Sequence, residues 1–447
     1  MPLLLFVRRR EQHRSCAART GISNPSRMMN ITSIYVHLFR NFQRFQAFFP
    51  HSGAFAGRQM RWKGIAVMYL DEKSAKTVSA KPVIIVLSHL RWDFVFQRPQ
   101  HLLTRAARDF SVFFIEEAIF EGEIASERRL MREAGVCVIQ PIVPHGTSEA
   151  DIIAHQRSIA EAVATAAGSA PIVLWYYTPM ALAFGQHIAA DVVVFDKMDE
   201  LSAFAFAPRQ LLEREQQTLD VADLVWTGGP SLFRAKKDRS PNVHCFPSSV
   251  DAAHFKQTLA EPADHVHLAQ PRFGFYGVID ERIDLAILAT LAEAHPECEI
   301  VLVGPVVKID PAHLPQAANL HYLGQHSYSE LPAYLGGWDV CLLLFARNEA
   351  TRFISPTKTL EYMAAGKPIV STPITDVAEP YGEIVYLGDN TAEFVQACEQ
   401  ALNATVAERE QRTVAMREVL ARTSWDRTAA AMDDLIEQAI AQQFATA

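Results

Sequence analysis

From residue 81 onward, short apolar runs rich in β-branched residues alternate with segments of helical pattern. Near-continuous apolar strands are typical of a parallel sheet covered by helices on both faces, and the alternation indicates right-handed βαβ units. The strands expected in a first series are 83–87, 112–115, 136–139, 172–176, 192–195, 224–227 and 244–246. The helices expected between them are 99–108, 150–167 and 209–220.

The alternation pauses at 256–271, a stretch with two prolines and no period, which we expect to be a linker. A second series of strands is then expected at 273–278, 299–303, 320–323, 340–345, 369–372 and 384–387. Its helices are expected at 285–294, 328–335, 357–365, 392–401 and 425–444.

These patterns predict an α/β chain with two doubly wound domains. The first is expected at 81–255 and the second at 272–424, while a terminal helix in 425–447 is expected to pack back on the first domain. Ligands of such sheets bind at the carboxyl ends of the strands and between facing domains. We therefore expect the functional site in a cleft between the two halves.

The charge is unevenly distributed along the chain. Residues 1–67 hold 11 Lys and Arg residues and one acidic residue, whereas the remainder holds 31 basic and 49 acidic residues, a net charge of −18. An acidic body argues against nucleic acid as the main partner. We interpret 1–80 as a disordered basic extension, or as the product of a start placed upstream of Met60 or Met68. An interfacial helix over 31–49 and an organelle transit peptide are the alternatives.

Several classes of protein lack their usual signatures in this chain. The six cysteines show no C-x-x-C spacing and no histidine at metal-site spacing, which indicates a reducing compartment and no structural zinc. No apolar stretch reaches the ~18–20 residues that span a bilayer. The sequence has no glycine-rich NAD-binding motif, no P-loop of ATPases and kinases, and no G-x-S-x-G motif of hydrolases. It also has no D-x-D motif, which commonly holds a divalent ion on a diphosphate. Any phosphate must therefore be held by backbone N–H groups, a helix N-terminus and cationic side chains.

The most informative stretch is 355–372, S-P-T-K-T-L-E-Y-M-A-A-G-K-P-I-V-S-T. Ser355 or Thr357 is expected to cap a helix that ends at Gly366. Lys358 would add positive charge at the helix N-terminus, and Glu361, one turn further, could accept hydrogen bonds from ribose hydroxyls. An ordinary capped helix with both charges on a solvated face fits the spacing equally well.

The stretch resembles the nucleotide-sugar site of glycosyltransferases with the GT-B fold, K-x-x-E-x-M-A-x-G-K-P-V-V-x-T. Residues 246–255 are similar to the family segment P-N-G-V-D-x-x-x-F, with Ser248 and Ser249 in place of Asn-Gly, and 275–282 resembles G-R-L-x-x-x-K. Three segments of the first half look like a bacterial subgroup associated with cell-surface polysaccharide synthesis: 88–103, 174–180 and 195–204.

The resemblance implies two Rossmann-like domains facing across a cleft. It implies transfer of a hexosyl group from a nucleotide-diphosphate sugar to an acceptor hydroxyl on a saccharide or lipid-linked molecule, without cofactor or metal. A cytoplasmic enzyme is expected, with peripheral contact to the inner face of the plasma membrane left open. A nucleotide-sugar epimerase and a catalytically decayed nucleotide-binding scaffold are the alternatives. The donor-binding residues implied are Gly277, Arg282, Ser355, Thr357, Lys358 and Glu361.

Loops after strands of the first half are expected to face the acceptor. The catalytic candidates there are His89, Asp93, Asp196 and Asp199, because a carboxylate or imidazole could deprotonate the acceptor. The acceptor-binding candidates are Arg91, Trp92, Gln97, Arg98 and Glu117. The chain departs from the family pattern E-x7-E, since Phe353 stands eight residues before Glu361, and Val278 replaces a family arginine. Retention and inversion therefore both stay open.

Overall fold

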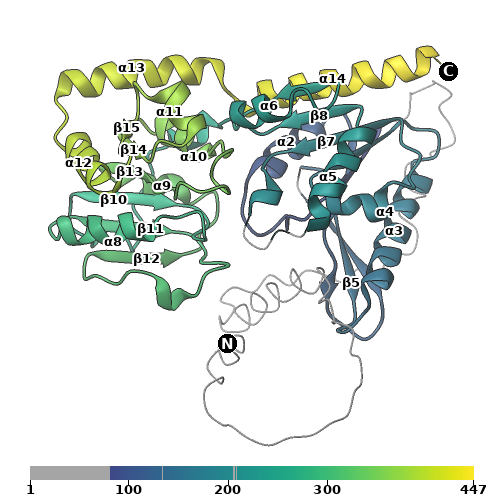
Figure 1. Ribbon diagram of the computed structural model, residues 1–447, viewed down its shortest axis with the longest axis horizontal. Helices are drawn as coiled ribbons and strands as arrows, with labels where there is room; N and C mark the ends of the chain where they lie inside the picture. Colours follow the sequence, from purple (N-terminus) through teal and green to yellow (C-terminus); the bar gives the residue numbers. More distant parts are fainter. Residues whose placement is uncertain (1–80, 133, 205–206, 208, 447) are drawn as a thin grey trace, which may run out of the picture. The chain divides into compact units, whose positions relative to one another are not determined.

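The computed structural model describes residues 81–132, 134–204, 207 and 209–446, and these residues form two sheets, each with its own helices (Figure 1). The first sheet has the strand order β3-β5-β2-β1-β6-β7-β8-β9, with β4 antiparallel to β5 and the other neighbours parallel. The second sheet is parallel throughout, in the order β12-β11-β10-β13-β14-β15. Both orders reverse direction next to the first strand of the half, as in doubly wound folds.

The central strands of the first sheet are continuous apolar runs, and β1 is buried along its whole length. The strands of this sheet are β1 Val83–Leu87, β2 Ser111–Ile115, β3 Ile119–Phe120, β4 Ser126–Met131, β5 Cys137–Val143, β6 Ile172–Tyr176, β7 Val192–Lys197, β8 Leu224–Thr227 and β9 Val243–Cys245. Its helices are α2 Arg98–Ala106, α3 Glu149–Ala166, α4 Leu182–Gly185, α5 Arg209–Val221 and α6 Pro230–Lys236, whereas α7 Ala252–Phe255 packs on the second half.

Successive residues of β1 enter two different cores because side chains of a strand alternate between faces. Ile84 and Val86 pack with residues of α2 on one face. Val83, Ile85 and Leu87 pack with residues of α3 and α4 on the other face. Both faces of the first sheet are therefore covered by helices.

The second half repeats this arrangement. Its strands are β10 Arg272–Tyr276, β11 Glu299–Val303, β12 Leu320–Gly324, β13 Val340–Leu343, β14 Ile369–Ser371 and β15 Tyr386–Leu387. Its helices are α8 Leu285–Ala294, α9 Leu331–Gly336, α10 Thr357–Ala364, α11 Thr375–Tyr381, α12 Thr391–Leu402 and α13 Val406–Arg422. One core contains side chains of α9, α10 and α13, and the other contains side chains of α8 and α12.

Helix α14, Trp425–Thr446, follows the second half in the chain but packs on the first (Figure 1). Trp425, Met432 and Ile436 belong to the same core as Ile84 and Val86 of β1. The Trp425 side chain is fully buried and stacks on His101 of α2 at 4.6 Å between ring centroids. The first half therefore takes part of its core from the far end of the described chain.

The fold class predicted from sequence is confirmed, and β1, β6, β8, β11 and α8 have the predicted bounds. The strands β3 and β4 were missed, as were the helices α4, α6, α7, α11 and α13. β4 escaped because its residues are mostly exposed and carry no apolar alternation. No helix or strand of the described residues falls within 256–271, and the domain boundaries drawn there stay predictions. The helix considered for 31–49 and the extension 1–80 lie outside the described residues.

Candidate functional site

The residues with candidate chemistry lie where the strand order of each sheet reverses. In the second half this point is between β10 and β13, and in the first half between β1 and β6. The loops that leave these strands cannot both cross over the same face, so their backbones separate at this edge and leave room for a ligand. Gly277 follows β10 directly and His89 lies two residues after β1.

The buried carboxylate of Glu361 stands at this edge of the second sheet. Only 6% of Glu361 is exposed, and its Oε2 accepts a hydrogen bond of 2.6 Å from the Tyr276 hydroxyl at the end of β10. Burial raises the pKa of Glu361, whereas the Tyr276 hydroxyl and Lys358 act to lower it. Tyr276 thus holds the carboxylate in one orientation.

Lys358 lies over a backbone that has no room for side chains. Gly277 has φ +136°, and a Cβ added there would come within 2.2 Å of Lys358 Cε. A Cβ on Gly304, after β11, would come within 1.9 Å of the Gly277 carbonyl oxygen. Burial lowers the pKa of Lys358, and the neighbouring charge of Arg282 lowers it further. Two glycines therefore keep a cationic side chain close to bare backbone.

Arg282 is fixed by a carboxylate that sequence reasoning did not single out. Its Nε and Nη2 donate to both oxygens of Asp280 at 2.7–3.1 Å, and Asp280 is only 2% exposed. The guanidinium lies 5.6 Å from the ring centroid of Phe204, and the Lys308 amine lies 5.1 Å from the same centroid. Lys308, with φ +63°, adds a second cation beside Arg282.

The start of α10 differs from the predicted cap. Its N-cap residue is Pro356, and no side chain caps the helix, so the prediction that Ser355 or Thr357 does so was wrong. The Ser355 carbonyl instead accepts a hydrogen bond from the Ser248 hydroxyl. Proline has no side-chain oxygen, so it cannot accept a hydrogen bond from the free N–H groups of the first turn. The N-terminus of α10 is left without the hydrogen bond that a capping side chain would provide.

In the first half, His89 is half-buried and its Nδ1 is closed to solvent without a hydrogen-bond partner among the described residues. Burial, together with the charge of Lys308, lowers the pKa of His89 to about 4, so the imidazole is neutral at pH 7. Tyr177, after β6, has a buried hydroxyl that interacts with the Asp196 carboxylate, and burial raises the pKa of Tyr177. Unpartnered buried polar atoms are rare, and His89 Nδ1 fits a site that binds a polar ligand.

Asp196 and Arg98 form a buried ion pair instead of two separate site residues. Arg98 Nε lies 3.0 and 3.2 Å from the two oxygens of Asp196, which is fully buried, and Arg98 Nη1 donates to the Phe246 carbonyl. The competing effects of burial and of Arg98 leave the pKa of Asp196 raised. This geometry ties β7 to α2 and to the segment after β9.

Asp199 lies three residues further, beside a ring of four charges. Lys197 and Lys236 each contact both Glu200 and Glu215 at 2.7–2.9 Å, with side chains that are 2–13% exposed. Burial raises the pKa of Asp199, although Arg282 and Lys197 oppose the rise. Around Asp199 the chain leaves only a narrow indentation without room for a water molecule, lined also by Tyr177, Pro179, Phe195, Lys197, Met198 and Leu201.

A second polar group surrounds Glu116 after β2. The Glu116 carboxylate accepts hydrogen bonds from Arg91 Nη1, from the Trp92 backbone N–H and from Gln140. Trp92 is buried and packs edge-to-face on Phe114, so its ring belongs to the core. The side chain of Glu117 is half-buried, and burial raises its pKa to about 7.

The remaining acceptor candidates lie further out. Asp93 is 58% exposed and pairs with Arg132. Gln97 is the N-cap residue of α2 and forms a capping box with Gln100. The structure therefore brings three of the sequence candidates together at one edge of the second sheet: Gly277, Lys358 and Glu361. Arg282 lies beside Phe204. Trp92 instead belongs to the core, and Asp93 forms an exposed ion pair. Tyr276, Asp280 and Lys308 were missed because only the folded chain brings them to these positions.

The fold is that of GT-B glycosyltransferases, with two parallel-sheet domains. A trehalose-6-phosphate structure from E. coli bound with UDP-2-fluoro glucose aligns with a TM-score of 0.61 at 12% identity, over 80% of this chain and 99% of that one. Sucrose-phosphate synthase from Thermosynechococcus elongatus aligns with a TM-score of 0.64 at 14% identity, over 81% of this chain and 100% of that one. At such identities the alignments establish the fold alone.

Within this fold, residues 270–404 match the family model for glycosyl transferases group 1. The chain is also 27% identical over 135 residues to TuaH of Bacillus subtilis (strain 168), which is described as a teichuronic acid biosynthesis glycosyltransferase. This match covers 29% of the chain and about a third of the relative, 34%. The resemblance predicted from sequence is thus confirmed for the second half.

Proposed function

We propose that this chain is a glycosyltransferase that moves a hexosyl group from a nucleotide-diphosphate sugar to an acceptor hydroxyl. The observation that carries the proposal is the Tyr276-oriented carboxylate of Glu361 at the point where the second sheet reverses, beside Lys358 and the bare backbone of Gly277. A buried carboxylate held by one donor has oxygen lone pairs left for vicinal ribose hydroxyls. The alignment with a protein bound to UDP-2-fluoro glucose makes UDP-sugars the first donors to test.

In the proposed reaction, the bond between the anomeric carbon and the β-phosphate oxygen breaks, and the acceptor oxygen forms a bond to that carbon. The leaving diphosphate gains negative charge, which Lys358, Arg282 and Lys308 would stabilise electrostatically. These cations give the reaction a way to proceed without a metal ion. We expect turnover to persist in the presence of a chelator at temperatures where the chain is folded.

The acceptor proton distinguishes two stereochemical courses. Inversion needs a base on the acceptor side. Asp199, whose pKa burial raises against the charge of Arg282, is the candidate base, while neutral His89 could hydrogen-bond the acceptor. Retention would let the leaving phosphate take the proton. The anomer of the product, determined by NMR, separates the two courses, and Asp199→Asn should abolish turnover only if the enzyme inverts.

A bacterial surface polysaccharide or its lipid-linked precursor is the acceptor class we propose, because the relative is described as acting in teichuronic acid biosynthesis. Such acceptors would place the enzyme in the cytoplasm at the inner face of the membrane. Among the described residues, none of the helices combines the length and the apolar character needed to traverse a bilayer. Co-sedimentation of the full chain with anionic vesicles tests the peripheral contact.

The first experiment measures thermal unfolding of the full chain with UDP, GDP, TDP and CMP. A ligand at 100 times its dissociation constant should stabilise the protein by about 2.7 kcal/mol, and each kcal/mol should raise the midpoint by roughly 2–4 °C. We expect one nucleotide to stabilise the wild type and the exposed control Glu383→Gln but not Glu361→Gln. Stabilisation by none of them would refute the donor site.

Activity assays on the same protein then distinguish the glycosyltransferase from the epimerase and from the scaffold. Transfer to a saccharide acceptor supports the glycosyltransferase. Conversion of the donor sugar without an acceptor would point to an epimerase, and nucleotide binding without any turnover would point to a scaffold.

A further inference from the structure

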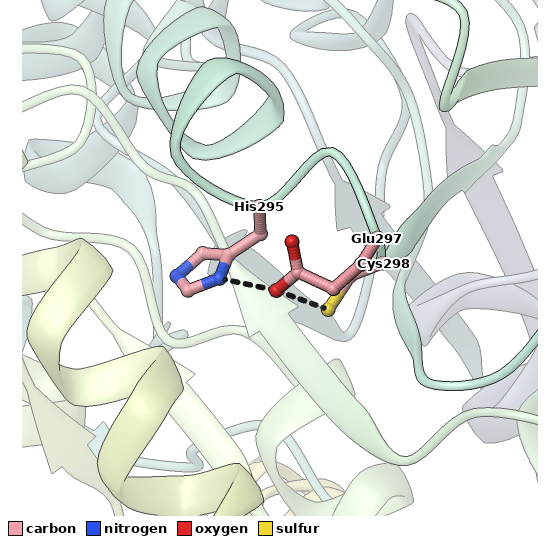
Figure 2. Close-up of side chains that lie close together, drawn as sticks. All are labelled: His295, Glu297 and Cys298. Atoms are coloured by element: carbon pink, nitrogen blue, oxygen red, sulfur yellow. Dashed lines mark hydrogen bonds and ion pairs between the residues drawn. The ribbon is translucent and has the colours of Figure 1, made fainter.

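The turn that joins α8 to β11 brings three different metal-ligating side chains together. His295 Nδ1 lies 3.1 Å from Glu297 Oε1, and Cys298 Sγ lies 3.7 Å from the same oxygen (Figure 2). The ligand atoms of all three residues lie within 4.8 Å of one another. Imidazole, thiolate and carboxylate are the ligands that zinc accepts in proteins.

These separations suit a tetrahedral ion. With metal–ligand bonds of roughly 2.0–2.3 Å, two ligand atoms of a tetrahedral zinc site lie about 3.3–3.7 Å apart. The distances from Glu297 Oε1 to His295 Nδ1 and to Cys298 Sγ are already close to this range. An ion therefore needs only that His295 Nδ1 and Cys298 Sγ move slightly toward each other. Side-chain rotations of His295 and the exposed Glu297 can supply that movement.

The other ring nitrogen of the histidine faces a second carboxylate. His295 Nε2 lies 3.4 Å from Oε1 of Glu399, which belongs to α12. Metal-bound histidines usually direct their second ring nitrogen to a carboxylate or carbonyl, which fixes the orientation of the ring and makes it a better ligand. Nδ1 is thus turned toward Glu297 and Cys298, while Nε2 lies within ion-pair distance of Glu399 on a different helix without a hydrogen bond to it.

We propose that His295, Glu297 and Cys298 bind one divalent cation of the zinc class, with Glu399 orienting the histidine. The side chain of Glu297 is 63% exposed, so the fourth coordination position opens to water. The bound ion would fasten the α8–β11 turn and, through Glu399, the neighbouring helix α12. Its role would be structural, because the turn precedes β11, whereas Gly277 and Gly304 follow β10 and β11 at the opposite edge of the sheet.

The state of the thiol predicts how binding depends on pH. A cysteine ligand binds a metal ion as the thiolate, whereas a free cysteine thiol is mostly protonated at neutral pH. Cation binding must displace that proton. The affinity should therefore rise with pH, and binding should release a proton that calorimetry in buffers of different ionisation enthalpy can count.

The test uses the full chain, stripped with a chelator and titrated with Zn²⁺ and with Co²⁺. We expect the wild type to bind one more Zn²⁺ per chain than Glu297→Ala does. With Co²⁺, we expect the wild type to show a thiolate-to-cobalt charge-transfer band. Cys298→Ser and His295→Ala should lose both signals. Glu399→Gln should weaken binding by about 10-fold to 100-fold, as expected for a residue behind the ligand shell.

Two variants serve as matched controls. His321→Ala removes a histidine that pairs with Glu299 at 2.6 Å without a thiol partner, and Cys341→Ala removes a buried cysteine elsewhere in the same sheet. Both should retain the ion. Because Glu297 is largely exposed, Glu297→Ala tests the site even if a buried variant fails to fold. Equal zinc binding by the wild type and Glu297→Ala, or a cobalt spectrum without a thiolate band, would overturn the proposal.

Discussion

At the scale of single residues, the proposed donor site depends on one hydroxyl. The Tyr276 ring is buried among aromatic neighbours, and its hydroxyl donates to Glu361. Tyr276→Phe preserves the packing and removes that bond. A hydrogen bond to a charged group contributes about 1.5–3 kcal/mol, so we expect nucleotide binding to weaken by roughly tenfold or more. Calorimetric titration with the stabilising nucleotide measures the change.

The same variant should alter the pH dependence of binding. Burial raises the pKa of Glu361 and the Tyr276 hydroxyl opposes that rise, so its removal raises the pKa further. If the carboxylate form binds ribose, affinity is lost as pH falls through this pKa, and in Tyr276→Phe the loss should begin at a higher pH. Identical pH profiles in the two proteins would contradict the role of Tyr276.

A single methyl group added at Gly277 should disturb the proposed donor site. The φ of Gly277, +136°, disfavours any side chain, and a Cβ would collide with Lys358. We expect Gly277→Ala to displace Lys358 and to weaken nucleotide binding by about tenfold or more. The control is Gly324→Ala. Gly324 also has a positive φ, +78°, but the space around an added Cβ is open, so this variant tests backbone strain without a steric clash. Titration of both variants with nucleotide, after circular dichroism confirms folding, makes the comparison.

At the scale of elements, the four-charge ring of Lys197, Glu200, Glu215 and Lys236 joins β7, α5 and α6. Lys236→Met leaves two nearly buried carboxylates with one cation, and removal of one partner from such a group costs about 3–5 kcal/mol. Lys237→Met, on the exposed neighbour, should change stability by less than about 0.5 kcal/mol. Urea unfolding at pH 7 compares the two.

The ring also predicts a response to acid. Burial would raise the pKa of Glu200, but Lys197 and Lys236 lower it from 4.5 to about 2. The stabilisation from this carboxylate is complete above its unfolded pKa and is lost as pH falls from about 4.5 toward 2. Lys236→Met should show a smaller loss of unfolding free energy over this interval than the wild type does.

The helices and strands that could be predicted from the sequence are those whose own residues show the expected apolar pattern. The run Val83–Leu87 is apolar throughout because both of its faces are buried, and its bounds were predicted without error. β4 forms on the exposed edge of β5, where pairing with a neighbour replaces any pattern of its own. The cap of α10 was misjudged because Ser355 and Thr357 both suit an N-cap by residue type, whereas the Ser355 carbonyl is hydrogen-bonded by Ser248, far away in the sequence.

The site residues likewise include some that a local motif predicts and others that only the folded chain brings into place. Lys358 and Glu361 stand in one helix, so a local motif could predict them. Tyr276, which orients Glu361, lies 85 positions away, and nothing local distinguishes it from another aromatic residue at the end of a strand. The cluster at His295 was missed although its three residues are nearly consecutive, because a search for paired cysteines excludes a site with one thiol and one carboxylate.

At the scale of the whole molecule, Trp425 connects the two ends of the described chain. Its side chain is fully buried in the core of the first half. Trp425→Ala should lower the free energy of unfolding of that half by about 3–5 kcal/mol, while nucleotide binding by the second half persists. Phe444→Ala, on the exposed side of the same helix, should have little effect. Urea unfolding followed with and without nucleotide distinguishes the two halves.

The return of α14 has a consequence for how the protein is made. Arg105 of α2 and Asp426 of α14 form an ion pair across 321 positions of sequence. Domains emerging from a ribosome tend to fold in order from the N-terminus. Here the first half emerges first, yet the surface that receives Trp425, Met432 and Ile436 stays uncovered until the entire second half has been translated. For that interval the nascent chain presents an apolar surface to solvent, and we expect chaperones to bind it there.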